Sequence, residues 1–196
     1  MRSIQFPVTP GKPGLKFLPF CINAGALALL MSLGTCLSTA AAVESPASVS
    51  RSVIVQGTPA EIWAMMGSFC AIERWLPPVG TCTEDGKAPP TRTLVTRDGK
   101  AVFVERQTAR SDSEYFYSYV FVSSPLPVTG YSSTIRVTAS GEGRSTVTWN
   151  GTYSPDAGKV DEAATALDGI YKSGLESIQR LAEQQLTSSA SNRATP

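Results

Sequence analysis

The sequence predicts an α+β domain in which one antiparallel sheet curves around a long C-terminal helix. Two short helical segments separate a first strand from the rest of the sheet. A run of about six strand-like segments follows, joined by turns rich in Gly, Asp and Ser. The long helical pattern begins after the last strand. Strands and helices that are segregated along the chain in this way are typical of α+β rather than α/β domains.

The first strand and the two short helices are marked by local signals. Residues 48–56 alternate and are rich in Val and Ile, as in a half-buried strand. Thr58 is a helix cap and Glu61 completes a capping box, so a helix is expected there. A second short helix is expected over residues 71–76, because the prolines at 77–78 cannot continue it.

The remaining elements follow from hydrophobic periodicity. Strands are expected over residues 79–84, 91–96, 101–109, 115–122, 131–139 and 145–153. Apolar residues recur at three- and four-residue steps over residues 160–185, which predicts one long helix with an apolar stripe. Residues 186–196 are rich in Ser, Thr and Ala and are expected to form a flexible tail. The folded domain is therefore predicted to span residues 43–185.

Residues 1–42 have the order of regions found in a secretory signal peptide. The segment contains basic residues and no acid before Glu44, then an apolar run over about residues 24–37 and three alanines at 40–42. The run is short for a membrane-spanning helix, so no integral span is expected after cleavage. The protein is predicted to be periplasmic or secreted; a retained anchor is the alternative.

Composition excludes several classes of function. The chain contains no histidine, which removes the usual metal ligand and neutral-pH base and any Ser-His-Asp or Cys-His mechanism. The formal net charge is +1, so nothing favours a nucleic-acid partner. No nucleotide-binding loop is present, and neither a cofactor nor a metal is expected.

Two cysteines, Cys70 and Cys82, lie beyond the predicted signal segment. In an oxidising compartment such a pair can form a disulfide. Two separate buried thiols, which behave as small apolar residues, are the alternative.

A succession of motifs resembles one family. These motifs are Trp75-Leu76-Pro77-Pro78-Val79, Cys82, Arg92-Thr93-Leu94, Asp98-Gly99, Glu105-Arg106, Pro125-Leu126-Pro127-Val128, Tyr131 and Thr146-Val147-Thr148-Trp149. Their order is similar to the SRPBCC superfamily of START-like helix-grip proteins, in particular its polyketide cyclase/dehydrase-like branch. The resemblance implies a sheet of seven strands around the last helix, with a cavity between them that binds a lipid, hormone, flavonoid or polyketide. A minority of members catalyse cyclisation or dehydration.

Plant abscisic-acid receptors share this fold and hold the ligand carboxylate with a lysine. The matching position here is Leu76, which argues against a carboxylate ligand held in that way. By the same resemblance, the loops at residues 97–101 and 123–130 correspond to those that close over the ligand. Leu126 would then cover the cavity, although its loop can equally be a stiff strand connection.

The resemblance directs Glu105 and the Phe103 face of its strand inward. A carboxylate in an apolar cavity has a raised pKa and can act as an acid or base, or accept a hydrogen bond from a ligand. A Glu that pairs with a cation at the rim is the alternative.

Tyrosines on one strand face suit a flat ring, and they equally suit ordinary core packing. Gly174 makes space for a ligand or packs closely on the sheet. The candidate ligand contacts are Leu76, Phe103, Glu105, Tyr117, Tyr119, Leu126, Tyr131, Ser133, Trp149, Tyr171 and Gly174.

Three functions are consistent with these residues. The favoured hypothesis is an exported protein that binds a small hydrophobic molecule in an internal cavity. A cyclase or dehydratase using Glu105 and a tyrosine as acid and base is the second. An interaction module with a filled core is the third, and a cavity smaller than about 300 Å³ would favour it.

Overall fold

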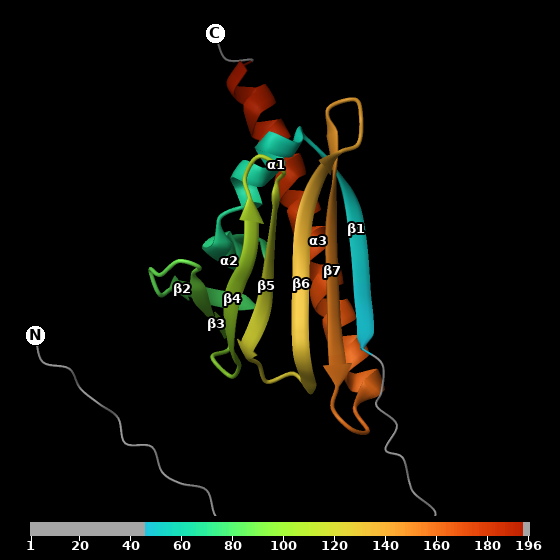
Figure 1. Cartoon of the computed structure of the whole chain (residues 1–196). Helices are drawn as coiled ribbons and strands as arrows, with labels where there is room; N and C mark the ends of the chain where they lie inside the picture. The colour runs from blue at the N-terminus through green and yellow to red at the C-terminus, as the bar shows by residue number, and fades with distance from the viewer. Residues whose placement is uncertain (1–45, 194–196) are drawn as a thin grey trace, which may run out of the picture. The chain divides into compact units, whose positions relative to one another are not determined.

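The computed structural model describes residues 46–193, so the predicted signal segment at residues 1–42 lies outside the described residues. Seven antiparallel strands form one sheet in the order β1-β7-β6-β5-β4-β3-β2 (Figure 1). The elements are β1 (Ala47–Gln56), α1 (Pro59–Met66), η1 (Phe69–Ala71), α2 (Ile72–Trp75), β2 (Val79–Glu84), β3 (Thr91–Thr96), β4 (Val102–Ser111), β5 (Phe116–Ser123), β6 (Val128–Ala139), β7 (Arg144–Pro155) and α3 (Val160–Arg193). The predicted α+β helix-grip architecture is confirmed.

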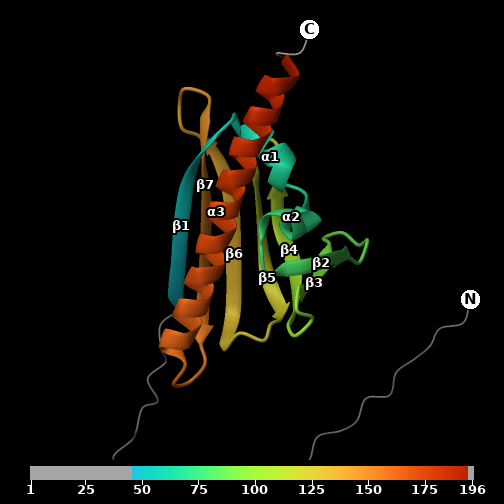
Figure 2. The ribbon, with the colours of Figure 1, turned by 180° about the vertical axis from the view of Figure 1, so that it is seen from behind.

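The first and last strands of the chain lie side by side in the sheet, because β1 pairs with β7. The short helices α1, η1 and α2 carry the chain from β1 to β2 at the opposite edge. Figure 2 shows α3 crossing one face of the curved sheet, with α1 and α2 on the same side. The space between this face and α3 is where the core and any ligand must lie.

Local sequence explains where α1 begins. The backbone N–H of Thr58 donates to Oε2 of Glu61 at 2.8 Å, and the N–H of Glu61 donates to the Thr58 hydroxyl at 3.4 Å. These reciprocal bonds satisfy two N–H groups that the helix itself leaves unpaired. The predicted capping box is therefore present.

The core consists of the inward faces of the strands and one stripe of α3. Strands β6 and β7 alternate between buried and more exposed side chains over most of their length. The α3 stripe buries Ala163, Leu167, Tyr171, Leu175, Ile178 and Ala182. The inward side chains of the strands, spaced every two residues, thus pack against the apolar stripe of α3 in one layer, as the sequence predicts.

The observed α3 continues to Arg193, whereas the sequence predicts its end at residue 185. Hydroxyls explain part of this difference. The side chains of Thr187 and Ser188 donate to the Gln184 carbonyl at 2.9 and 3.0 Å. Ser and Thr can bond back to the preceding turn in this way, so their presence does not end a helix.

No helix within the described part of the chain is long and apolar enough to cross a membrane.

Candidate ligand-binding cavity

An apolar cavity of about 200 Å³ lies between the sheet, α2 and α3. Seven predicted ligand contacts form part of its wall: Leu76, Phe103, Glu105, Tyr119, Leu126, Tyr131 and Trp149. Ala101 and Pro125 also line it, so both loops implicated by the sequence border the cavity. The wall also contains eight residues that were not predicted from the sequence: Ile72, Pro78, Val79, Leu94, Thr96, Phe121, Leu167 and Ile170. Two sequence patterns could have identified some of these residues. Period-two alternation directs Leu94 inward, and helical spacing places Leu167 and Ile170 on the apolar stripe of the last helix.

Glu105 is the one charged side chain in the cavity wall formed by the described residues. It is 4% exposed and lies opposite Arg92, its register partner on β3, which is 0% exposed. Arg92 Nε donates to Oε2 of Glu105 at 2.7 Å, and Nη2 makes an ionic contact of 2.6 Å with the same oxygen. The other oxygen, Oε1, receives no hydrogen bond from any described residue. The pair therefore presents one unused acceptor beside an apolar space.

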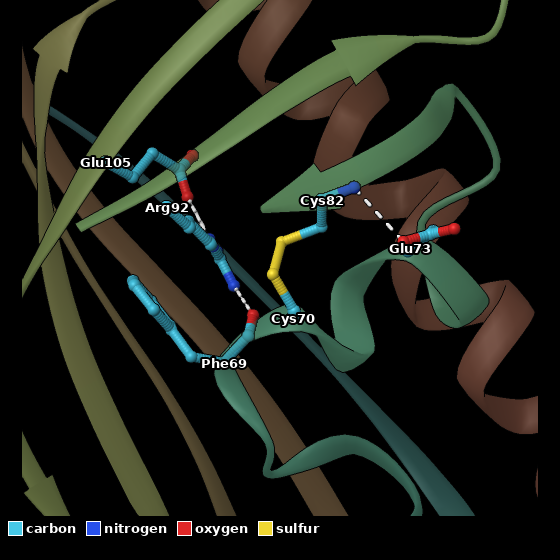
Figure 3. Close-up of a disulfide and its surroundings, with 6 residues drawn as sticks. All are labelled: Phe69, Cys70, Glu73, Cys82, Arg92 and Glu105. Atoms are coloured by element: carbon cyan, nitrogen blue, oxygen red, sulfur yellow. Dashed lines mark hydrogen bonds and ion pairs between the residues drawn. A yellow bond between two sulfur atoms is a disulfide. The ribbon is translucent and has the colours of Figure 1, made fainter. Parts of the chain in front are cut away.

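The surroundings of Arg92 hold its guanidinium in a fixed place (Figure 3). Nη1 donates to the backbone carbonyl of Phe69, and the guanidinium carbon lies 4.0 Å from the centre of the Phe69 ring. A cation over an aromatic face is stabilised by the quadrupole of the ring. Arg92 was not predicted as a site residue, because an Arg in a strand more often lies at the surface.

Burial and charge act in opposite directions on this pair. Burial raises the pKa of the Glu105 carboxyl and the Arg92 guanidinium lowers it, with a net increase above the usual value. Burial lowers the pKa of Arg92, whereas the Glu105 carboxylate raises it, and the net pKa lies above its already high value. A buried guanidinium that cannot lose its proton requires a counter-charge, so Glu105 carries the matching negative charge.

A chain of buried hydroxyls forms the second polar feature beside the cavity. Ser133 Oγ donates to the Asn150 carbonyl at 2.7 Å, which uses its single proton. The Tyr171 hydroxyl must then donate to Ser133 at 2.8 Å, and the Tyr131 hydroxyl to Tyr171 at 2.7 Å. Tyr119 completes the chain by donating to Tyr131 at 3.4 Å.

The direction of this chain decides which hydroxyl can serve a ligand. The contact between Tyr119 and Tyr131 is the longest in the chain and both residues line the cavity. Tyr119 can therefore turn its proton to a ligand acceptor at the lowest cost. Burial raises the pKa values of Tyr119 and Tyr131 well above normal and raises that of Tyr171 to about 12, so all three are neutral phenols at neutral pH.

Four predicted contacts do not lie in the cavity wall. Tyr117 packs against the rings of Trp63 and Phe69, with centroids 5.9 and 5.6 Å away, because its strand position directs it under α1 and η1. Ser133 and Tyr171 support the wall through the hydroxyl chain. The Tyr171 ring stacks on Trp149 at 4.1 Å.

Gly174, the fourth of these, allows close packing rather than opening space for a ligand. A Cβ at this position would lie 2.8 Å from the Trp149 ring, 3.1 Å from Leu76 and 3.3 Å from Trp75. The absence of a side chain lets α3 approach these three residues. Of the two interpretations of Gly174 left open by the sequence, close packing on the sheet is therefore the one that fits the structure.

The structure contains a disulfide between Cys70 and Cys82, with the Cα atoms 5.5 Å apart. It joins η1 to β2 and lies one residue from Phe69 (Figure 3). Within the described residues, no group of three His, Cys, Asp or Glu side chains is placed to hold a metal ion.

A curved antiparallel sheet around a long helix, with an apolar cavity between them, defines a helix-grip protein. Residues 46–183 match the family described as "Polyketide cyclase / dehydrase and lipid transport". The chain belongs to this family, as its motifs suggest. No curated protein matches the chain.

Solved structures show the same fold. XoxI from Bacillus cereus is 31% identical, with a TM-score of 0.65, and the match covers 69% of this chain and 95% of XoxI. The Zhui aromatase/cyclase from Streptomyces sp. R1128 is 16% identical with a TM-score of 0.59, over 72% of this chain and 96% of that one. The di-domain ARO/CYC BexL from the BE-7585A biosynthetic pathway is 15% identical with a TM-score of 0.62, over 72% of this chain and 47% of that one.

Proposed function

We propose that this protein binds a small, uncharged and mostly apolar molecule in the cavity between its sheet and α3. The observation that carries the proposal is the free Oε1 of Glu105 in a wall that is otherwise almost wholly apolar. Glu105 lines the cavity and Oε1 has no donor from the described residues, so a ligand hydroxyl or amine in the cavity would supply one. The ligand would thus be held by apolar contact and oriented by one charge-assisted hydrogen bond.

The size of the cavity limits the ligand. Its volume of about 200 Å³ is below the ~300 Å³ at which drug-sized pockets begin. A cavity of about 150 Å³ is enough to bind benzene in another protein. By the limit of about 300 Å³ this volume points toward a filled core. The benzene example shows that it still leaves room for a molecule of one or two rings. A larger polyketide would require the loops at residues 97–101 and 123–130 to move.

Charge further limits the ligand. Glu105 and Arg92 neutralise one another, so the cavity has no spare positive charge to hold an anion. A ligand carboxylate near Oε1 would be repelled in a medium of low dielectric. Leu76, which stands in the wall where the hormone receptors have a lysine, offers no compensation.

The same proposal includes export. The disulfide between Cys70 and Cys82 supports an oxidising compartment, where such bonds persist. The signal-like sequence of residues 1–42 supports the same location. Detection of the processed chain in the periplasmic or extracellular fraction, with its new N-terminus near residue 43, would test this part; a full-length chain in the cytosol would contradict it.

Native mass spectrometry of the purified protein, followed by organic extraction, tests the binding proposal. We expect a reproducible small molecule at about one per chain. Ala101→Trp is the matched control and should carry no ligand, because the large side chain would fill the cavity. Ala101 lines the cavity just before β4, so the change should leave the packing of the core intact. A mass without ligand for both proteins, with no binding of small aromatic probes, would contradict the proposal.

An enzymatic role is the second candidate, favoured by the raised pKa of Glu105 beside the releasable Tyr119 hydroxyl. Such a pair can move a proton in a cyclisation or dehydration. Glu105→Gln separates the two functions, because its amide oxygen still accepts a hydrogen bond but cannot take a proton. A binding protein would retain much of its affinity, whereas carboxylate-dependent turnover would be lost.

A further inference from the structure

We infer that the Cys70–Cys82 disulfide and Arg92 act as positioning groups that keep Oε1 of Glu105 free for a ligand. This inference rests on the proposed binding function and goes beyond it, because it names groups outside the cavity wall that set ligand selectivity. Neither cysteine nor Arg92 lines the cavity. Their effect must therefore pass through Glu105.

A continuous set of contacts connects the disulfide to the carboxylate (Figure 3). Cys70 directly follows Phe69, whose carbonyl accepts from Nη1 of Arg92 and whose ring lies beneath the guanidinium. The guanidinium then contacts Oε2 of Glu105 through Nε and Nη2. The bond from Nη1 to Phe69 fixes the orientation of the guanidinium, in which Nε and Nη2 both face Oε2 and Nη2 has no hydrogen-bond acceptor.

The segment that bears Phe69 has little stability of its own. Helix η1 has three residues and α2 has four, and neither has a side-chain cap. Helices this short do not persist alone. The disulfide ties this segment to β2, and Glu73 on α2 adds a hydrogen bond of 3.1 Å from the backbone N–H of Cys82. The hydrogen bond holds α2, whereas the disulfide holds Cys70 directly beside Phe69, so breaking the disulfide loosens the residue that carries the Phe69 carbonyl.

Loss of the disulfide changes what Arg92 can contact. If the Phe69 carbonyl moves away, the guanidinium is released to turn, and its buried Nη2, which lacks a hydrogen-bond acceptor, gains by reaching a second oxygen. Oε1 of Glu105 is an unused acceptor on the carboxylate that Arg92 already contacts. Arg and carboxylate readily form a two-pronged pair. Oε1 would then be occupied by Arg92, and a ligand hydroxyl would find no acceptor.

The test compares two probes of nearly equal size, naphthalene and 2-naphthol, by isothermal titration calorimetry. The wild-type protein should bind 2-naphthol about tenfold more tightly, the effect of one hydrogen bond to a charged group. In the Cys70→Ala/Cys82→Ala variant this ratio should fall to about one while naphthalene affinity is retained. Adding Arg92→Lys to that variant should restore part of the ratio, because an ammonium has no planar fork with which to occupy both oxygens.

Reduction of the folded wild-type protein provides a second readout if the double variant does not fold. A phosphine takes one oxygen from water and leaves two thiols, and the ratio should fall as in the variant. An unchanged ratio after loss of the disulfide overturns the inference, and so does an equal loss of affinity for both probes. Wild-type protein that binds neither probe overturns the proposed function itself, which is a distinct result.

Discussion

Replacing Arg92 by Met would leave the Glu105 carboxylate buried without its counter-charge. Both side chains are almost fully buried, at 0% and 4% exposure, so solvent gives little screening. Breaking such a pair by removing one partner costs about 3–5 kcal/mol of the free energy of unfolding. For a domain of this size, about 2–4 °C of Tm is lost per kcal/mol, so the Tm should fall by about 6–20 °C.

The loss of stability in Arg92→Met should increase as the pH rises. Arg92 opposes the effect of burial on Glu105, so its removal raises the pKa of Glu105 further. A carboxyl whose pKa is higher in the folded than in the unfolded state favours folding when protonated. The variant should therefore be closest to wild type below the unfolded pKa of Glu. It should lose stability as the pH rises through the raised pKa of folded Glu105.

Urea unfolding followed by tryptophan fluorescence measures this loss at about pH 5 and at neutral pH. Arg92→Met/Glu105→Leu is the matched control, because replacing a whole buried pair by apolar residues is often neutral or stabilising. The double variant should recover most of the stability lost in Arg92→Met. The reasoning is refuted if the single change costs less than about 1 kcal/mol, if its effect is the same at both pH values, or if the double variant is as unstable as the single one.

Two further predictions concern the packing around Trp149. Gly174→Ala should destabilise by about 1–3 kcal/mol, because its Cβ would meet the Trp149 ring at 2.8 Å. Gly169→Ala in the same helix has nothing within 4 Å and should stabilise by about 0.5–1 kcal/mol; equal effects in thermal unfolding would contradict the packing account. Ser133→Ala removes the acceptor used by Tyr171 and Trp149 and should cost about 1–3 kcal/mol. Chemical denaturation measures this loss, and a change below about 0.5 kcal/mol would show that Ser133 is not needed to satisfy these two donors.

Most of the fold follows from short-range patterns in the sequence. The box between Thr58 and Glu61 begins α1, and alternation assigns the inward faces of β4 to β7. These signals are readable because side-chain direction repeats every two residues in a strand and every 3.6 in a helix. The inward direction of Glu105 came from the family resemblance together with this alternation, and the structure places the residue in the cavity wall.

Other features depend on residues that are distant in sequence. Arg92 contacts Glu105 and Phe69, which lie 13 and 23 positions away, and no local pattern indicates such a pair. The same holds for Gly174, whose role depends on rings from α2 and β7. The sequence also left the pairing of Cys70 and Cys82 open, since spacing does not establish that two Cα atoms come within bridging distance. Local periodicity thus determines the elements and their faces, whereas burial, charge pairing and cavity volume arise only when separate elements meet.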